Sequence, residues 1–145
     1  MFATLGGECA VSANGAEDKI RLFIIDDNTA VRRALEARLS RVPDFELLGG
    51  EGDINEALSH VGALKPDVLL VESKRRDGNG LRLCQQVLEM PDSPEIILLT
   101  SFIDEDEQLA AASLGLHRYV LKDIASSELI CTIHDAYTER CARHH

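Results

Sequence analysis

From Lys19 onward, the chain alternates short runs of apolar, often β-branched residues with longer stretches in which apolar residues recur every three or four positions. A short run that is apolar at nearly every position is typical of a strand buried on both sheet faces. Alternation of such strands with helices predicts a parallel sheet covered by helices. The predicted strands are Ile20 to Ile25, Phe45 to Gly49, Asp67 to Val71, Glu95 to Thr100 and Arg118 to Leu121.

Amphipathic stretches with recognisable helix boundaries follow these strands. The first, Thr29 to Arg41, ends before a proline, and the third runs from Leu81 to Met90. Asp53 is a suitable N-cap for the second, and the fourth begins near Asp104 with acids in its first turn, where they favour the helix dipole. The fifth begins after Ser126 or Ser127. The sequence therefore predicts an α/β fold of five βα units.

Length and composition favour one domain with two short tails. The chain has 145 residues, of which 45% are hydrophobic, enough for one core of ordinary size. Residues 1–18 lack periodicity and are expected to form a flexible tail, residues 19–140 the domain, and residues 141–145 a tail or tag remnant. No apolar run approaches the roughly 18 residues of a membrane span, and the start lacks secretory features, so we expect a cytoplasmic protein without membrane contact.

Charge and cysteine usage exclude some kinds of site. The formal net charge of −10 disfavours direct nucleic-acid binding by this chain, because phosphate contact needs a basic surface. The 4 cysteines show no CxxC or Cys/His clustering, which disfavours a zinc site or a disulfide framework. Reduced, structural thiols are the expectation.

Polar residues stand where four of the predicted strands end. Asp26 and Asp27 follow the first strand, Glu72 the third and Lys122 the fifth, and Thr100 ends the fourth. Ligands of open parallel sheets bind at the carboxyl ends of the strands. Carboxylates, a hydroxyl and an ammonium group at one edge suit a divalent cation and a phosphoryl group. The alternative is a set of helix caps and ion pairs on a solvated rim.

Four segments carry a family resemblance: IRLFIIDDN, KPDVLLVE with DGNGLRLC beyond it, EIILLTS, and YVLKD followed by SSEL. In order and spacing, they resemble the landmarks of the receiver domain of bacterial two-component response regulators, over about residues 19–138. The sequence of these segments is most similar to that of the branch in which the receiver domain is followed by a helix-turn-helix DNA-binding domain. The resemblance implies a flavodoxin-like, doubly wound sheet of order 2-1-3-4-5.

The resemblance also implies roles for individual residues. Asp26 and Asp27 match the acidic pair that holds Mg²⁺, with Glu72 and the backbone carbonyl of Lys74 completing the metal ligands. Lys122 could neutralise the acids instead of Mg²⁺, because two carboxylates about 4 Å apart repel by about 4 kcal/mol at an effective dielectric near 20.

Three further residues match the phosphoryl pocket and the switch. Thr100 and Lys122 match the phosphoryl-binding pair, and Thr100 and Tyr119 match the switch residues. Tyr119 could equally be a rim residue with its hydroxyl in water. Of the following basic residues, Arg76 could lean into the pocket, whereas Arg75 is expected in a solvated loop.

The sequence departs from the family at the phosphoacceptor, where Glu72 replaces the usual aspartate. Glutamate is longer by one carbon–carbon bond, about 1.5 Å, which moves its carboxylate into the space of the phosphoryl group. We therefore expect no phosphorylation of the usual kind, and a histidine kinase partner is doubtful. Glu72 either mimics the activated state in part or is a structural partner of Lys122.

The sequence as a whole predicts an atypical receiver, a signal-transduction module and not an enzyme. It would act through a partner or as a homodimer formed by the fourth helix, fifth strand and fifth helix, and so regulate an output such as transcription. One alternative is a receiver-like module that senses a ligand. The other alternative is a flavodoxin-like enzyme. It has little support, because the sequence contains neither a P-loop nor a GxSxG motif.

Overall fold

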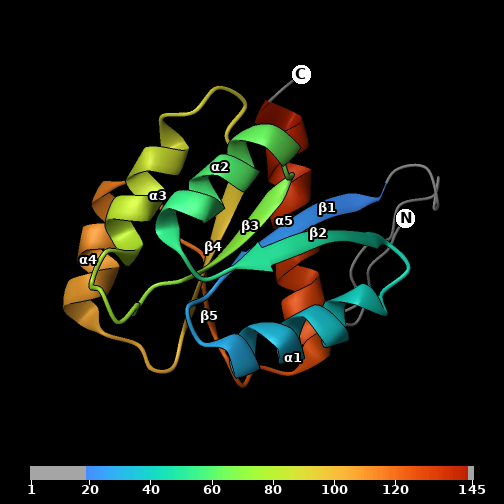
Figure 1. The fold of residues 1–145 in the computed structure, drawn as a ribbon, viewed down its shortest axis with the longest axis horizontal. Helices are drawn as coiled ribbons and strands as arrows, with labels where there is room; N and C mark the ends of the chain where they lie inside the picture. The colour runs from blue at the N-terminus through green and yellow to red at the C-terminus, as the bar shows by residue number, and fades with distance from the viewer. Residues whose placement is uncertain (1–18, 144–145) are drawn as a thin grey trace.

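The computed structural model describes residues 19–143, in which five strands alternate with five helices (Figure 1). The elements are β1 (Ile20–Ile25), α1 (Thr29–Ser40), β2 (Phe45–Glu51), α2 (Ile54–Leu64), β3 (Val68–Glu72), α3 (Gly80–Leu88), β4 (Glu95–Thr100), α4 (Glu105–Ser113), β5 (Tyr119–Leu121) and α5 (Ser126–Arg143). The predicted bounds of β1 and β4 are confirmed at both ends. Those of β2, β3 and β5 differ by one or two residues at an end.

All strands are parallel, and the sheet order is β2-β1-β3-β4-β5, which confirms the predicted doubly wound topology. The chain reverses its winding direction between β1 and β3, and ligands of such sheets bind beyond this point. The register places Glu72 beside Leu99, and Thr100 beside Leu121. The polar ends of β1, β3, β4 and β5 consequently meet at one edge of the sheet.

Helices cover both faces of the sheet and divide the core into two layers. Figure 1 shows α1 and α5 on one side and α2, α3 and α4 on the other. On the first side, Leu35 of α1 and Ile133 of α5 pack against Ile24 and Leu70. On the second side, α2, α3 and α4 pack against the alternate residues of the same strands. Because both faces are covered, the residues of β3 are all buried, as its unbroken apolar sequence predicts.

The structure differs from the sequence-based expectations in details of the helices and cysteines. α5 continues through Arg143, so residues 141–143 are helical. Of the cysteines in residues 19–143, Cys84 and Cys141 are free and Cys131 is disulfide-bonded, so the expectation of reduced thiols is wrong for Cys131. The tail predicted at residues 1–18 lies outside the described residues. Within those residues, no helix is long and apolar enough to cross a membrane.

Gly80 allows the start of α3 to lie against the loop after β3. A Cβ atom at this position would be 2.3 Å from the backbone carbonyl oxygen of Ser73, closer than any side chain tolerates. Because backbone occupies this space, it cannot be cleared by a rotamer change. The glycine therefore determines how closely the β3–α3 loop approaches α3.

We expect Gly80→Ala to lower the free energy of unfolding by about 1–3 kcal/mol, the usual cost of overpacking. Gly62→Ala is the matched control, since Gly62 is an exposed residue of α2 with nothing within 4 Å of the added Cβ. The control should raise stability by about 0.5–1 kcal/mol, because alanine is the better helix former. Urea denaturation of both variants measures the difference, and equal effects would contradict the close approach.

Candidate functional site

Three carboxylates gather at the ends of β1 and β3. Asp26 and Asp27 follow β1, and Glu72 is the last residue of β3, its neighbour in the sheet. One oxygen from each of the three lies within 4.8 Å of the other two. Asp26 is fully buried and Glu72 nearly so, with 7% exposure. The carboxylates thus share one partly desolvated site, as the strand ends predict.

Lys122 brings its ammonium group between two of these carboxylates. Its Nζ lies 3.0 Å from Oδ2 of Asp26 and makes a second ion pair with Oε1 of Glu72. The residue is positioned by its backbone N–H, which donates to the Thr100 carbonyl over 2.9 Å at the end of β4. The lysine therefore links the ends of β1, β3 and β5.

The pKa values of Glu72 and Lys122 are shifted by burial and by the charges around them. Burial raises the pKa of Glu72, and the charges of Asp26 and Asp27 add to this, against the opposing effect of Lys122. Burial alone would lower the pKa of Lys122, but hydrogen bonds to Glu72 and Asp26 outweigh it, and the pKa is raised. The site therefore favours a further positive charge, either a proton on Glu72 or a cation.

The two aspartates are held by backbone groups around them. Oδ1 of Asp26 accepts a hydrogen bond from the N–H of Asn28 at 2.8 Å, and Oδ2 of Asp27 accepts one from the N–H of Arg76 at 2.9 Å. Arg32 donates to the backbone carbonyl of Asp26 at 2.7 Å. The first two bonds orient the carboxylates, and the third holds the backbone of Asp26.

This donor set fits a hard divalent cation. Carboxylate oxygens are the preferred ligands of Mg²⁺, and a cation would neutralise charge that the three clustered carboxylates share. Asp26, Asp27 and Glu72, with the backbone carbonyl of Lys74, are the residues that would hold it. Lys122 already compensates part of the charge, so the cation would share the site with the ammonium group.

Thr100 lies at the site, but its hydroxyl is engaged in its own loop. Its Oγ1 donates to the carbonyl of Phe102 at 2.7 Å and accepts from the N–H of the same residue at 3.4 Å. Among the described residues, no bond from this hydroxyl to the acidic cluster is found. Within residues 19–143, Glu72 therefore pairs with Lys122, and the Thr100 hydroxyl makes no hydrogen bond to it.

The side chain of Lys74 forms contacts that the sequence-based interpretation missed. Its Nζ lies 3.4 Å from Asp104 and 3.3 Å from Glu107 at the start of α4, and 4.3 Å from the ring centroid of Phe102. Ser73 adds a hydrogen bond to Glu107 at 3.2 Å. The loop after Glu72 is thus tied directly to α4. The one sequence signal for this link was the presence of two acids, Asp104 and Glu107, three residues apart at the predicted start of the fourth helix.

The neighbouring arginines differ from expectation. Arg75 is buried, with 7% exposure, which corrects its assignment to a solvated loop. It donates to the carbonyl of Gly52 at 2.6 Å and forms an ion pair with Asp77 at 3.2 Å. Arg76 is exposed, and its backbone N–H is the group that reaches Asp27. Burial of Arg75 was missed because an arginine beside two other basic residues is usually solvated.

Tyr119 packs against the core layer beneath α3 and α4. Its hydroxyl is buried and makes no hydrogen bond within residues 19–143, so the alternative of a hydroxyl in water is wrong. Burial raises the pKa of Tyr119 to about 12, with the negative charge of Glu107 contributing. The residue is thus coupled to the same part of α4 that Lys74 holds.

We expect Tyr119 to titrate late in the folded protein. Since the folded-state pKa of Tyr119 exceeds its ordinary value of 10, its neutral form is favoured by folding, and its contribution to stability is lost as pH rises above 10. Absorbance at 295 nm should therefore show a late step assigned to Tyr119, absent in Tyr119→Phe. Tyr137→Phe is the control. Loss of the late step in the control instead would contradict the burial.

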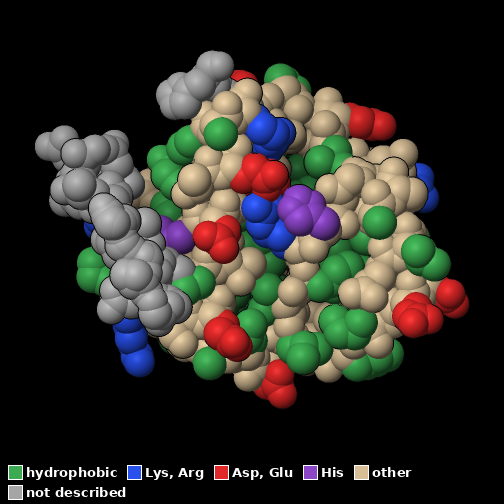
Figure 2. All heavy atoms as spheres, turned by 180° about the vertical axis from the view of Figure 1, so that it is seen from behind, with side chains coloured by type: hydrophobic (Ala, Val, Ile, Leu, Met, Phe, Trp, Pro, Cys, Tyr) green, Lys and Arg blue, Asp and Glu red, His purple; other side chains and the backbone are tan. Residues whose placement is uncertain are grey.

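A second feature is an exposed apolar surface beside the site. Large apolar side chains are exposed on the β4–α4 loop, α4 and β5, and Figure 2 shows hydrophobic side chains gathered over this region. We call these residues the α4–β5 face: Phe102 (59% exposed), Ile103 (46%), Leu109 (71%) and Leu121 (39%). Ala111 is the one buried residue of α4, so this helix is lightly anchored.

Comparison with known sequences identifies the arrangement. A family model described as the response regulator receiver domain matches residues 22–134. The chain is 34% identical over 116 residues to the DNA-binding transcriptional activator DevR/DosR of Mycobacterium tuberculosis, and 34% identical over 117 residues to the transcriptional regulatory protein LiaR of Bacillus subtilis. These matches cover 80% and 81% of the chain but 54% and 56% of the relatives. The chain thus spans about half the length of these relatives.

Solved structures agree on the fold. The signal receiver domain of a modulated diguanylate cyclase from Desulfovibrio desulfuricans G20 superimposes with a TM-score of 0.78 at 21% identity, covering 87% of this chain and 99% of that one. The signal receiver domain of the putative response regulator NarL from Mycobacterium tuberculosis gives 0.74 at 23% identity, covering 83% and 98%. At these identities the likeness concerns the fold alone.

Proposed function

Because the chain belongs to the response regulator receiver domain family, we propose that it is an atypical receiver, a regulatory module and not an enzyme, which works without phosphorylation of the usual kind. The observation that carries this proposal is the ion pair between Lys122 and Glu72. The lysine that would meet a phosphoryl group already holds a carboxylate, and that carboxylate belongs to the residue at the acceptor position.

Geometry and charge both support this proposal. Glu72 reaches about 1.5 Å further than aspartate, and its end is occupied by the lysine. Burial disfavours its ionised form, which is also the nucleophilic form. A carboxylate has one charge, whereas a phosphoryl group has nearly two charges and three acceptor oxygens. Glu72 is therefore a fixed and incomplete substitute for phosphorylation, and it acts chiefly as the partner of Lys122.

Exposure to a small-molecule phosphodonor tests this proposal. We expect the intact mass of the full chain to stay unchanged after incubation with acetyl phosphate or phosphoramidate and Mg²⁺. A stoichiometric, hydroxylamine-labile gain that maps to Glu72 would overturn the proposal. Phosphorylation at another residue would not restore the acceptor role of Glu72, and peptide mapping distinguishes the two cases.

We also propose that the acidic cluster binds Mg²⁺, and that Lys122 weakens this binding. The support is the convergence of Asp26, Asp27 and Glu72 within 4.8 Å, set against the ammonium group that already neutralises part of their charge. Titration with millimolar Mg²⁺ should shift the amide signals of Asp27 and Asn28. A sodium salt at equal ionic strength, without divalent cations, should not shift them. Absence of a shift removes the metal from the proposal.

The output of the module is proposed to be regulation of transcription in the cytoplasm. The sequence relatives are transcription regulators by their names, and the net charge of −10 makes direct DNA contact by this chain unfavourable. The chain would instead transmit its signal through a protein partner or a second copy of itself. No cognate histidine kinase is required for this mode.

The α4–β5 face, together with α5, is the proposed surface for self-association. Among the described residues, Phe102 and Ile103 are exposed large apolar side chains that are adjacent in sequence. Leu109 and Leu121 enlarge this apolar surface. Sedimentation velocity over a range of concentrations should show a dimer that Leu109→Asp abolishes. Leu88→Asp, on α3, is the matched control. A monomer at all concentrations would count against the homodimer.

A further inference from the structure

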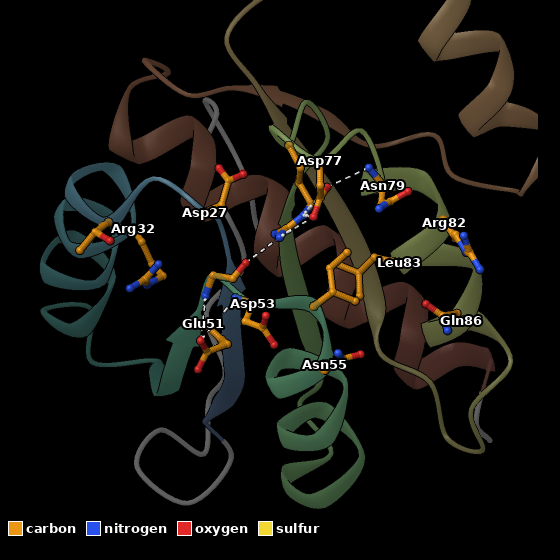
Figure 3. A pocket seen from close by; sticks show the side chains of 14 residues that line it. Asp27, Arg32, Glu51, Asp53, Asn55, Asp77, Asn79, Arg82, Leu83 and Gln86 are labelled. Atoms are coloured by element: carbon orange, nitrogen blue, oxygen red, sulfur yellow. Dashed lines mark hydrogen bonds and ion pairs between the residues drawn. The ribbon is translucent and has the colours of Figure 1, made fainter.

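A polar pocket of about 690 Å³ lies beside the acidic cluster, between the starts of α1, α2 and α3. Figure 3 shows Asp27 and Arg32 on one side, Asp53 and Asn55 at the start of α2, and Arg82 and Gln86 along α3. Neither Lys122 nor Thr100 is among its lining residues. The pocket is therefore distinct from the Lys122–Glu72 pair, although it shares Asp27 with the acidic cluster. Its volume suits a small organic molecule.

Arg75 lines this pocket with an unused donor group. Its side chain is 4% exposed, and it contacts Gly52 and Asp77 through Nε and Nη2. Its Nη1 is buried and has no hydrogen-bond partner within residues 19–143. Leaving a buried donor of a charged group unpaired is costly. Because Arg75 lines the pocket, a ligand that draws its guanidinium group toward an acceptor oxygen would supply the missing partner.

Further donors line the same space. Arg32 and Arg82 add two cationic side chains to the lining. The side chains of Asn28 and Asp53 cap α1 and α2, whereas the side chain of Asn79 makes no capping hydrogen bond at the start of α3. The uncapped start of α3 leaves backbone N–H groups available to an anion.

The acids of the pocket are largely occupied by groups of the protein. Asp77 is held by Arg75, Asp53 caps α2, Glu51 accepts from the backbone of Gly52 and Asp53, and Asp27 accepts from Arg76. They keep an anion away from the α2 side of the pocket. They could still accept hydrogen bonds from hydroxyl or amino groups of a ligand, because carboxylates have several acceptor sites.

We propose that this pocket binds a small molecule carrying an oxyanion, a phosphate or a carboxylate, with Arg75 and the start of α3 holding the anionic group. Guanidinium groups match the geometry of both anions. The inference does not depend on whether Glu72 is phosphorylated, since it concerns different residues.

Titration of the full chain with inorganic phosphate and, separately, with acetate tests the proposal, with chloride at equal ionic strength as the reference. We expect saturable shifts of the amide signals of Gly52, Asp77, Asn79 and Gly80 in the millimolar range. Phosphate binding tighter than acetate would assign the ligand as a phosphate compound, and the reverse as a carboxylate. Shifts confined to Ser101 and Lys122, or no saturable shift, would overturn the proposal.

Variants locate the anion within the pocket. Arg75→Met should weaken binding about tenfold or more, the loss expected for a hydrogen bond to a charged group. The neighbouring Arg76→Met is the matched control and should bind as the wild type does. Arg82→Gln changes an exposed residue of the lining and should weaken binding by a smaller factor even if Arg75→Met does not fold. Wild-type affinity in both lining variants would overturn the proposal.

Discussion

Replacing Lys122 by methionine should lower the free energy of unfolding by about 3–5 kcal/mol, the largest stability change expected for a single substitution at the site. The lysine neutralises Asp26, which is fully buried, and Glu72, and its own side chain is 15% exposed. Without it, two desolvated carboxylates face each other unpaired. Equilibrium urea denaturation at neutral pH measures the loss.

Two comparisons separate the charge effect from a packing effect. Lys19→Met removes an exposed lysine and should change stability by less than about 0.5 kcal/mol. Adding Glu72→Gln to Lys122→Met should restore part of the loss, since one of the unpaired charges is removed. If the double variant is no more stable than Lys122→Met, electrostatic pairing is not what the lysine contributes.

Replacing Glu72 by aspartate should allow acetyl phosphate to phosphorylate the chain, a reaction that we propose does not occur with glutamate at this position. The shorter side chain withdraws its carboxylate from Lys122 by about 1.5 Å, which leaves room for the incoming phosphoryl group. Asp26, Asp27 and Lys122 already stand around that space. Intact mass and hydroxylamine sensitivity measure the gain.

Glu72→Gln is the control for this conversion, because it keeps the length of the side chain but lacks a nucleophilic carboxylate. It should show no gain under the same conditions. If Glu72→Asp also stays unmodified, the acceptor residue is not what prevents phosphorylation, and other departures in the pocket must be responsible. The inward bond of the Thr100 hydroxyl to Phe102 is the first of these to examine.

The fold and the composition of the acidic site could be predicted because both follow from strand order. Largely apolar runs identified β1, β3 and β4, and parallel pairing then brought Asp26, Glu72 and Lys122 to one edge. The direction of individual side chains could not be predicted. The Thr100 hydroxyl turned to its own loop because the Phe102 carbonyl lies within reach, a choice that residue spacing does not determine.

Loop residues and helix ends account for the other differences. Arg75 is buried because the carbonyl of Gly52 and the carboxylate of Asp77 both face it, and these partners come from different loops. The hydroxyl of Tyr119 is buried although the residue lies on β5, an edge strand of three residues that is too short to show a periodic pattern. The end of α5 extends past its apolar residues, where Arg143 is bound to Glu95 of β4. Such tertiary contacts leave no periodic trace in the sequence.

The bridge from Lys74 to Asp104 and Glu107 also bears on how this domain could convey information. A protein that docks on Leu109 and shifts Asp104 or Glu107 would alter the equilibrium of the loop that begins at Ser73, and by thermodynamic reciprocity a ligand of that loop would alter the docking affinity by the same factor. Communication between Leu109 on α4 and the loop after β3 would then run in both directions without covalent modification.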